Sequence, residues 1–252
     1  MSGSKVVVVT GAASGIGRSI AELATARGWP VTAVDLDASG LASLEGPSVA
    51  TVVGDVSEAT TWDRVVETNL EVHGRHAQAF VSNAAVIEVG TVAEVTDDAW
   101  SRVFEVNVMG AVRGVRALLP GMLADGGGSV VTIGSIDAYM AEQGLMAYST
   151  SKAALLQFTR NLAIDHSREG IRANCVCPGV TDTPLFRYHL SHAEDPETLL
   201  ATREARQPQG ALLRPEQVAE VALFLAGDDS QAVTGALVPV DGGLSTSFEY
   251  RT

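Results

Sequence analysis

The stretch Val6-Val7-Val8-Val9-Thr10-Gly11-Ala12-Ala13-Ser14-Gly15-Ile16-Gly17 decides the fold that we expect for this chain. Its first five residues form a continuous β-branched run, which is typical of a parallel strand covered on both faces. After the glycines, apolar residues recur at helical spacing from Ile20 until Gly28. A strand, a glycine-rich turn and a helix in this order form a cradle for a pyrophosphate, because glycines let the backbone come close and a helix N-terminus offers free N–H groups.

The rest of the chain repeats this alternation of strands and helices. Apolar, β-branched runs predict strands at 31–34, 49–53, 79–81, 130–133, 171–177 and within 236–243. Helical periodicity predicts helices at 57–74, starting at a Ser57 cap, at 97–124, after Tyr148 and at 215–225. We therefore predict an α/β fold, a single-domain, Rossmann-like doubly wound sheet over residues 1–252 that is mainly parallel and has helices on both faces.

Length, charge and composition exclude several classes of protein. The chain has 252 residues, of which 46% are hydrophobic, and this suits a globular α/β domain. Its net charge of −13 repels nucleic acid and anionic membranes. The start Met1-Ser2-Gly3-Ser4-Lys5 lacks a signal-peptide pattern and no apolar run reaches the length of a membrane span. We expect a soluble cytoplasmic protein with no nucleic-acid or membrane partner.

The cysteines and histidines give no metal-binding pattern. Cys175 and Cys177 are the only cysteines, and two positions apart on a strand they share a face but are too closely tied for an ordinary disulfide. We expect both to be buried as small apolar residues. His189 and His192 have no third ligand nearby, so we predict no metal site.

Tyr148 and Lys152 form the clearest chemical pattern. In a helix, which the apolar residues after Lys152 indicate, a spacing of i, i+4 places both on one face. A phenol has a pKa near 10, and a fixed ammonium beside it favours the phenolate. The hydroxyl of Ser135, at the end of the strand at 130–133, can hold a substrate oxygen against the tyrosine. This combination suits proton exchange with an alcohol or a ketone.

Together these motifs resemble the classical short-chain dehydrogenase/reductase family. The glycine spacing Gly-x-x-x-Gly-x-Gly after Thr10 and the Tyr-x-x-x-Lys pattern are the family's forms, and the resemblance runs from Val6 to Gly243. It implies an NAD-dependent oxidoreductase that interconverts a small-molecule secondary alcohol and a ketone. The implied catalytic residues are Asn107, Ser135, Tyr148 and Lys152, with the carbonyl of Asn107 holding a water that leads to Lys152.

Asp35, at the end of the second strand, decides the expected cofactor. A carboxylate there accepts hydrogen bonds from the adenosine ribose and repels a 2′-phosphate. Relatives that use the phosphorylated cofactor usually have a basic residue before the second glycine or after this strand, where this chain has Ser14 and Leu36-Asp37. We therefore predict NAD.

The resemblance assigns further cofactor contacts. It places Asp55 at the adenine amino group, Val56 at the adenine face, and Val180 and Thr183 at the nicotinamide side. Ser82-Asn83-Ala84-Ala85 departs from the family's Asn-Asn-Ala-Gly at its first and last positions. The candidate cofactor-binding residues are Gly11, Ser14, Gly15, Ile16, Gly17, Asp35, Asp55, Val56, Asn83, Ala84, Tyr148, Lys152, Pro178, Gly179, Val180 and Thr183.

Two segments are expected to enclose the substrate. In the family, 136–147 forms a wall of the pocket and 184–214 forms a mobile lid. The first segment offers Asp137, Glu142 and Gln143, and the second offers His189 and His192, as polar groups that either contact substrate or face solvent.

Three other functions remain open. A 3-oxoacyl thioester ketoreductase is more often served by NADP and a basic docking surface, which the sequence lacks. Enoyl reductases of the superfamily space the tyrosine and lysine more widely than this chain does. A non-catalytic nucleotide-sensing protein is expected to have lost a catalytic residue, whereas all four are present. The resemblance also implies a homo-oligomer, either a tetramer or a dimer.

Overall fold

Seven parallel strands form the centre of the computed structural model, which describes residues 5–44 and 46–247. The expectation for the N-terminal residues 1–4 falls outside that range. The strands are β1 (Val7–Thr10), β2 (Val31–Asp35), β3 (Val49–Val53), β4 (Ala79–Ser82), β5 (Gly128–Ile133), β6 (Ile171–Pro178) and β7 (Leu237–Val240). Their order is β3-β2-β1-β4-β5-β6-β7, and every neighbouring pair is parallel. The predicted doubly wound sheet is confirmed.

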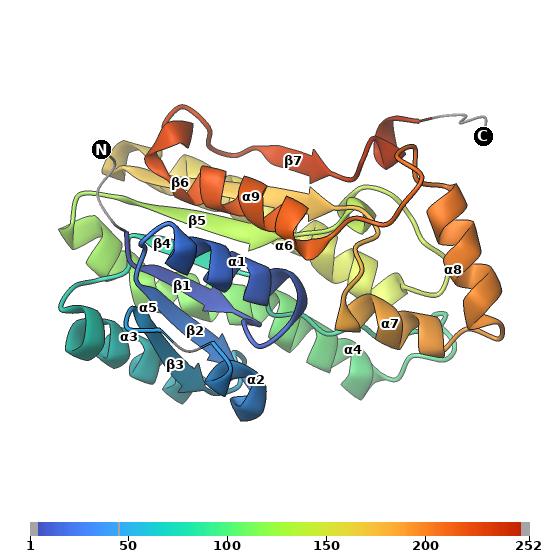
Figure 1. Cartoon of the computed structure of the whole chain (residues 1–252), viewed down its shortest axis with the longest axis horizontal. Coiled ribbons are helices and arrows are strands. Elements are labelled where there is room, and N and C mark those ends of the chain that lie inside the picture. The colour runs from blue at the N-terminus through green and yellow to red at the C-terminus, as the bar shows by residue number, and fades with distance from the viewer. Residues whose placement is uncertain (1–4, 45, 248–252) are drawn as a thin grey trace.

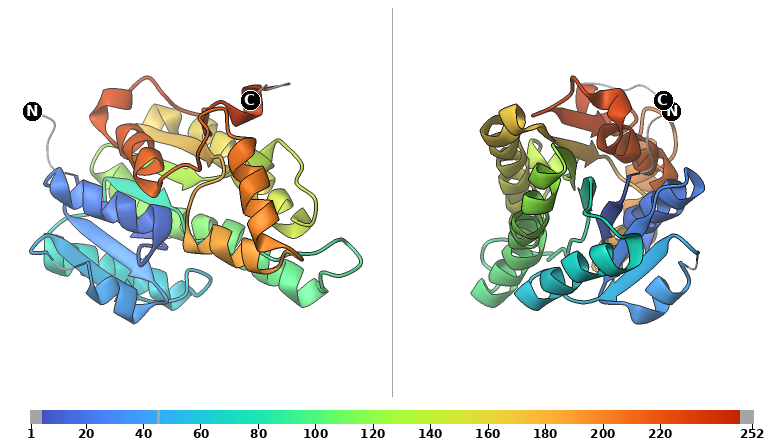
Figure 2. Two further views of the ribbon diagram at one scale, coloured as in Figure 1. Left: turned by 45° about the vertical axis from the view of Figure 1, so that its right-hand side comes forward. Right: turned by 90° about the vertical axis from the view of Figure 1, so that its left-hand side faces the viewer.

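Helices cover both faces of this sheet, as predicted. They are α1 (Gly15–Ala26), α2 (Ala38–Ala42), α3 (Ala59–His73), α4 (Asp97–Phe104), α5 (Gly110–Ala124), α6 (Met146–His166), α7 (Pro184–Ser191), α8 (Pro196–Ala205) and α9 (Pro215–Ala226). The right-hand view of Figure 2 shows α1 and α9 on one side of the strands and α5 and α6 on the other.

The valine run of β1 explains this two-sided core. Val7 and Val9 pack with residues of α1 and α9, whereas Val6 and Val8 pack with residues of α3, α5 and α6. All four are fully buried, because alternate residues of a central strand face opposite layers of helices. Each buried valine contributes about 1.5 to 3 kcal/mol through the hydrophobic effect.

The strand order also determines where a ligand can bind. β1 lies between β2 and β4, so the chain leaves the centre of the sheet in opposite directions after these strands. The loops after β1 and β4 therefore diverge at the carboxyl ends of the strands and leave a crevice there. Figure 1 shows this edge on the right, next to α7 and α8.

Two predicted helices differ from the structure in detail. The prediction that a helix begins at a Ser57 cap was wrong: α3 begins at Ala59 after Glu58, because the Ser57 hydroxyl donates instead to Asp55 Oδ1, 2.7 Å away. The predicted helix over 97–124 is interrupted by a π-helical turn at Glu105–Met109.

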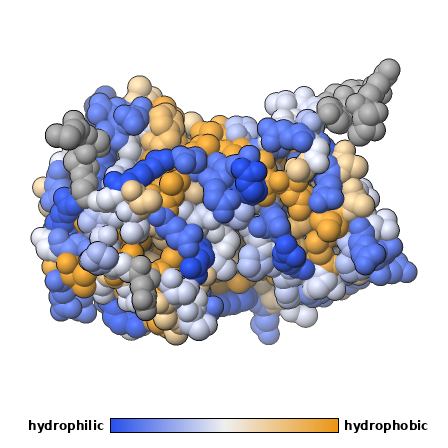
Figure 3. Space-filling view, in the orientation of Figure 1, coloured by the Kyte–Doolittle hydropathy of each residue, from blue (hydrophilic) through white to orange (hydrophobic). Residues whose placement is uncertain are grey.

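The predicted lid, residues 184–214, contains α7 and α8. Both helices begin with a proline, and the side chains of Thr183 and Asp195 cap their N-termini. Hydrophobic residues gather on the surface where the two helices meet (Figure 3). None of the helices in the described ranges is long and apolar enough to cross a membrane.

Candidate active site

The loop between β1 and α1 is built for close approach to a ligand. Gly11 and Gly15 have φ values of +65° and +55°, which favour glycine. A Cβ on Gly17 would lie 2.1 Å from the carbonyl oxygen of Gly11, so any side chain there would displace the loop. Ser14 precedes the first turn of α1 and is exposed. The Ser14 side chain forms no capping bond, so the first N–H groups of α1 are available to a pyrophosphate.

Thr10 and Asn83 join the ends of β1 and β4 beside that loop. The Thr10 hydroxyl oxygen accepts hydrogen bonds from the main-chain N–H groups of Asn83 and Ala84, at 3.0 and 3.1 Å. In return, Asn83 Nδ2 donates to the carbonyl oxygen of Thr10 at 3.0 Å. These bonds fix the position of the loop after β1 relative to the loop after β4, at the crevice.

Asp35 lies at the carboxyl end of β2 and stabilises the glycine loop. Its Oδ2 accepts a hydrogen bond from Ala13 N at 2.9 Å, and its Oδ1 accepts one from Asp37 N at 3.0 Å. Each oxygen keeps a lone pair for another donor. The carboxylate therefore lies where the hydroxyls of an adenosine ribose can donate to it.

Arg102 is a residue of this cleft that the sequence did not reveal. From α4, its guanidinium donates to Asp55 Oδ2 at 2.9 Å and to the Ser57 hydroxyl at 3.2 Å. Burial alone would raise the pKa of Asp55, but the bonds from Ser57 and Arg102 together hold it below its ordinary value. Asp55 is therefore an ionised residue beside the predicted adenine position. No motif links residues so far apart in the chain.

Ten of the predicted cofactor residues line one cleft of about 250 Å³: Gly11, Ser14, Gly15, Ile16, Asp35, Asp55, Val56, Asn83, Ala84 and Thr183. Gly17 lies beneath it, against the carbonyl of Gly11. The glycine cradle and the ribose-facing carboxylate fit a dinucleotide.

A second cleft, of about 140 Å³, continues from the first, since both are lined by Ile16, Asn83 and Thr183. It brings together Ser135, Tyr148 and Lys152 with the other predicted nicotinamide-side residues, Pro178, Gly179 and Val180. Tyr148 is 9% exposed, Ser135 8% and Lys152 2%, so only a small part of each side chain is open to the cleft.

Lys152 and Tyr148 lie one turn apart on α6, as their spacing predicts. Lys152 Nζ is 5.5 Å from the centre of the Tyr148 ring and donates to the carbonyl oxygen of Ile133 at 2.7 Å. Burial lowers the pKa of Lys152 to about 8. The ammonium is thus held against the end of β5, beside the phenol.

The expected lowering of the Tyr148 pKa by Lys152 is outweighed within this chain. Burial, and then the negative charge of Asp137, raise the pKa of Tyr148 above its ordinary value, and the interaction with Ser135 offsets only part of that rise. Tyr148 is therefore a protonated phenol at neutral pH, which is the form that donates a proton.

Asn107 lies in the π-helical turn between α4 and α5 and lines neither cleft. Its Oδ1 accepts a hydrogen bond from Val86 N at 2.8 Å, and its Nδ2 donates to Val86 O at 2.9 Å and to the Ser151 hydroxyl at 3.0 Å. The side chain thus connects the loop after β4 to α6, next to Lys152.

Three of the five candidate substrate residues line the second cleft: Asp137, Glu142 and His189. Gln143 and His192 line only an adjoining hollow under the lid. Arg203, on α8, was not expected here; its guanidinium pairs with Glu142, and His189 Nδ1 lies 4.0 Å from the same carboxylate. Within residues 5–44 and 46–247, no group of three or more His, Cys, Asp or Glu side chains is arranged to hold a metal ion.

Cys175 and Cys177 are both free and fully buried beneath this site, on β6. Their sulfur atoms are 3.7 Å apart, and both lie close to Gly134. The expectation that they behave as buried small side chains agrees with these positions.

The chain combines a doubly wound parallel sheet with a dinucleotide cradle and with a buried tyrosine–lysine pair at the carboxyl ends of the strands. These features define a class of nucleotide-dependent oxidoreductases. Comparison with known proteins identifies the family. A family model described as enoyl-(acyl carrier protein) reductase matches residues 11–245. The chain belongs to the classical short-chain dehydrogenase/reductase family, whose members use a nicotinamide cofactor.

Individual relatives cover nearly the whole chain. A 2-(R)-hydroxypropyl-CoM dehydrogenase of Xanthobacter autotrophicus is 36% identical over 249 residues, which are 95% of this chain and 98% of the relative. A cis-4-hydroxycyclohexanecarboxylate dehydrogenase of Sinomonas cyclohexanicum is 37% identical over 250 residues, covering 95% and 96%. The ligand-free structure of an aldohexose dehydrogenase of Thermoplasma acidophilum superimposes with a TM-score of 0.89 at 28% identity, covering 99% of this chain and 97% of that one.

Proposed function

We propose that this protein is an NAD-dependent dehydrogenase that interconverts a secondary alcohol and a ketone. The observation that carries the proposal is the position of Ser135, Tyr148 and Lys152 in the cleft that continues from the dinucleotide cradle. When bound, the nicotinamide supplies or accepts the hydride. The relatives named as dehydrogenases of hydroxylated carbons support the same reaction type.

Tyr148 is the proposed acid and base at the substrate oxygen. Because its pKa is raised, the phenol keeps its proton at neutral pH and can donate it to a ketone oxygen. In the oxidative direction the phenolate must form, and the Lys152 ammonium one turn away favours it. Ser135 holds the substrate oxygen against the tyrosine.

We propose that Asn107 holds a water through which protons pass between Lys152 and solvent. Its side chain is bonded to Val86 and Ser151, so we assign the relay water to the main-chain carbonyl within the π-helical turn. That water would connect Lys152 to solvent.

NAD, rather than NADP, is proposed from the charges near the ribose. Asp35 presents a carboxylate, and the next residues are Leu36 and Asp37. Arg18, in the first turns of α1, bonds to Glu22 and Ser43. A 2′-phosphate would meet the Asp35 carboxylate, and the guanidinium groups of Arg18 and Arg102 are already paired with Glu22 and Asp55.

Three alternatives have less support: a 3-oxoacyl thioester ketoreductase, an enoyl reductase and a non-catalytic nucleotide-sensing protein. The net charge of −13 disfavours an acidic carrier protein as the partner of a ketoreductase. Only three residues separate Tyr148 from Lys152, whereas enoyl reductases space this pair more widely. Loss of catalysis would be expected to alter one of the four catalytic residues, and none is altered. We also propose a homo-oligomer, a dimer or a tetramer, on the basis of the family resemblance. Light scattering coupled to gel filtration tests this.

The proposed reaction is tested by following NADH formation from NAD with cyclic secondary alcohols, polyols, sugar acids and hydroxysteroids. We expect turnover that disappears in Tyr148→Phe while NAD still binds, because the variant removes only the phenolic hydroxyl. Retention of most of the activity in Tyr148→Phe, or turnover with NADP alone, would contradict the assignment.

A further inference from the structure

The Ser135 hydroxyl is already hydrogen-bonded to Asp137, a second residue of the substrate cleft. Ser135 Oγ donates to Asp137 Oδ2 at 2.9 Å, and Asp137 N donates back to Ser135 Oγ at 3.1 Å. A hydroxyl has one proton to donate. While that proton points at Asp137, Ser135 can offer a substrate oxygen only a lone pair. A ketone oxygen, which is itself only an acceptor, gains no hydrogen bond from it in this state.

Asp137 lines the substrate cleft as a carboxylate that forms no salt bridge with any residue that the structure describes. The charged and titratable groups that act on it or that it acts on are Tyr139 and Glu142 in the same wall, Tyr148 and Lys152 on α6, His189 on α7 and Arg203 on α8. The Arg203 guanidinium pairs with Glu142, and burial, followed by the charge of Arg203, lowers the pKa of His189. In the described part of the chain Asp137 forms no ion pair, so the cleft contains one carboxylate available to a donor from the substrate.

The spacing of Ser135 and Asp137 matches a particular arrangement of substrate oxygens. In a gauche vicinal diol the two oxygens are separated by roughly one hydrogen-bond length, about 2.8 Å. Ser135 Oγ and Asp137 Oδ2 are 2.9 Å apart. One oxygen of such a diol can therefore face Ser135 while the neighbouring hydroxyl donates to Asp137.

We propose that Asp137 selects alcohols that carry a second hydrogen-bond donor on the carbon next to the carbinol, with vicinal diols as the substrate class. The second hydroxyl takes the place of Ser135 at the carboxylate, and the freed Ser135 proton turns to the carbinol oxygen. Oxidation then removes a hydride from the carbinol carbon, which passes to NAD⁺, and a proton from its oxygen, which passes to Tyr148. The product is an α-hydroxy ketone. This inference rests on the proposed dehydrogenase function.

Burial, then the charge of Glu142, raise the pKa of Asp137 to about 6. At pH 7 and above the group is largely ionised and can only accept. A simple secondary alcohol leaves it without a donor from the substrate and leaves Ser135 turned away. A β-amino alcohol would present an ammonium to the same carboxylate. Because a hydroxyl and an ammonium would both donate to Asp137, the experiment tests a diol and an amino alcohol separately.

The test compares cyclohexanol, cyclohexane-1,2-diol and 2-aminocyclohexanol with NAD at pH 8. For the wild-type enzyme we expect kcat/KM for the diol to exceed that for cyclohexanol by about 10- to 100-fold, the range of one hydrogen bond to a charged acceptor. Asp137→Leu should abolish this preference. Asp137→Asn retains an acceptor oxygen without the charge, so it should reduce the preference for the diol to about 2- to 10-fold and remove any preference for the amino alcohol.

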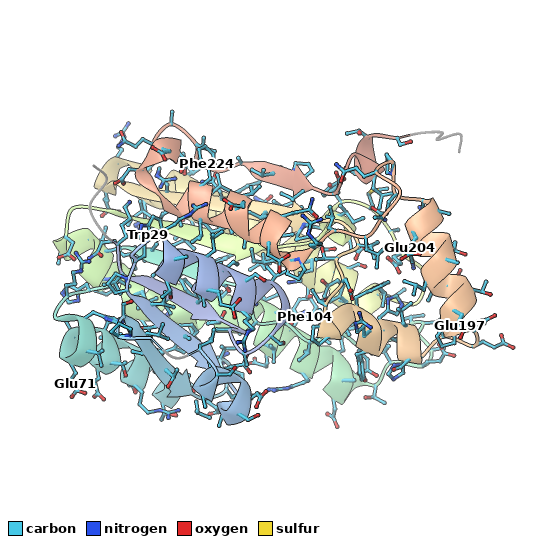
Figure 4. The ribbon with its side chains drawn as sticks, in the orientation of Figure 1. Trp29, Glu71, Phe104, Glu197, Glu204 and Phe224 are labelled. Carbon is cyan, nitrogen blue, oxygen red and sulfur yellow. The ribbon has the colours of Figure 1, made fainter. Side chains whose placement is uncertain are left out.

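Glu197→Gln is the matched control. Glu197 is exposed on α8 and points away from the rest of the chain (Figure 4), so the diol to cyclohexanol ratio should stay at the wild-type value. Equal turnover of diol and cyclohexanol by the wild type, or an unchanged preference in Asp137→Leu, would overturn the inference.

A binding measurement separates this inference from the proposed function. Calorimetric titration of the NAD-loaded enzyme with diol and with cyclohexanol needs no turnover. Tighter binding of the diol by about 10-fold or more, lost in Asp137→Leu, supports the role of Asp137 even if no alcohol in the panel is oxidised. Equal binding overturns it, and absence of turnover with all alcohols counts against the dehydrogenase function alone.

Discussion

The side-chain amide of Asn107 clamps the main chain of Val86 from both sides. Val86 N donates to Asn107 Oδ1 at 2.8 Å, and Asn107 Nδ2 donates to Val86 O at 2.9 Å. Because Val86 lines the cofactor cleft and Ser151 on α6 accepts a third bond, one buried side chain positions both the loop after β4 and the helix that carries Lys152.

We expect Asn107→Leu to lower both NAD affinity and turnover, and to destabilise the fold by about 1 to 3 kcal/mol, since it leaves the half-buried Val86 N–H without its acceptor and removes the bond to the Ser151 hydroxyl. Asn107→Asp keeps the acceptor for Val86 N but loses the two donated bonds. It should show an intermediate loss in thermal unfolding. Wild-type NAD affinity in Asn107→Leu would contradict this role.

Gly17→Ala should prevent NAD binding. The new Cβ would lie 2.1 Å from the carbonyl oxygen of Gly11 and 2.5 Å from Asn83 Nδ2, so the loop must move. Gly46→Ala is the control, because the nearest atom to its Cβ would be Val49 Cγ2 at an ordinary 3.5 Å. Fluorescence titration with NADH distinguishes the two variants, and similar affinities in both would refute the proposed cradle.

Asp35→Asn should relax the choice between NAD and NADP. The amide can still accept from Ala13 N, but it no longer repels a 2′-phosphate. We expect the ratio of kcat/KM for NAD over NADP to fall by roughly one order of magnitude, equivalent to the effect of one pKa unit of interaction. The ratio is obtained with a single alcohol and both cofactors. An unchanged ratio would show that Asp35 does not face the ribose.

Asp137→Asn should stabilise the protein in a pH-dependent way. Since the pKa of Asp137 is raised to about 6, its favourable contribution to unfolding free energy is complete below pH 4 and is lost as pH rises through 6. Asparagine does not titrate. The variant should therefore match the wild type near pH 4 and exceed it by about 3 kcal/mol at pH 8, since the pKa is raised from 3.8 to about 6 and each pKa unit corresponds to about 1.4 kcal/mol. Urea unfolding at both values checks the sign, and equal stability at pH 8 would contradict it.

We expect the effects of Glu142 and Arg203 on stability to be coupled, because the two side chains form an ion pair. Burial is the main cause of the raised pKa of Glu142, and Arg203 opposes it. Arg203→Met leaves a half-buried carboxylate unpaired and should cost about 1 to 3 kcal/mol of stability. Adding Glu142→Gln should recover most of that loss in a double-mutant cycle. Additive losses would show that the two side chains do not interact in solution.

Much of the fold could be predicted because the sequence patterns that indicate it lie within short segments of the chain. The valine run of β1 identified a strand buried on both faces, and the glycine spacing identified the turn after it. The i, i+4 spacing of Tyr148 and Lys152 placed them on one face of α6. The helix predictions differed from the structure where a side chain bonds to a residue that the local sequence pattern does not include. Ser57 did not cap α3 because Asp55 took its hydroxyl, and Asn107 lies in a π-helical turn whose side chain bonds to Val86.

The parallel sheet and the glycine-rich turn follow from the sequence alone, since strand period, turn geometry and helix spacing act between close neighbours in the chain. Only the tertiary structure brought Arg102 to Asp55 and Arg203 to Glu142, pairs that are far apart in sequence. It also decided that burial and Asp137 raise the pKa of Tyr148 despite Lys152. The physical reason is that ion pairing and desolvation depend on distances through space, which no periodicity along the chain encodes.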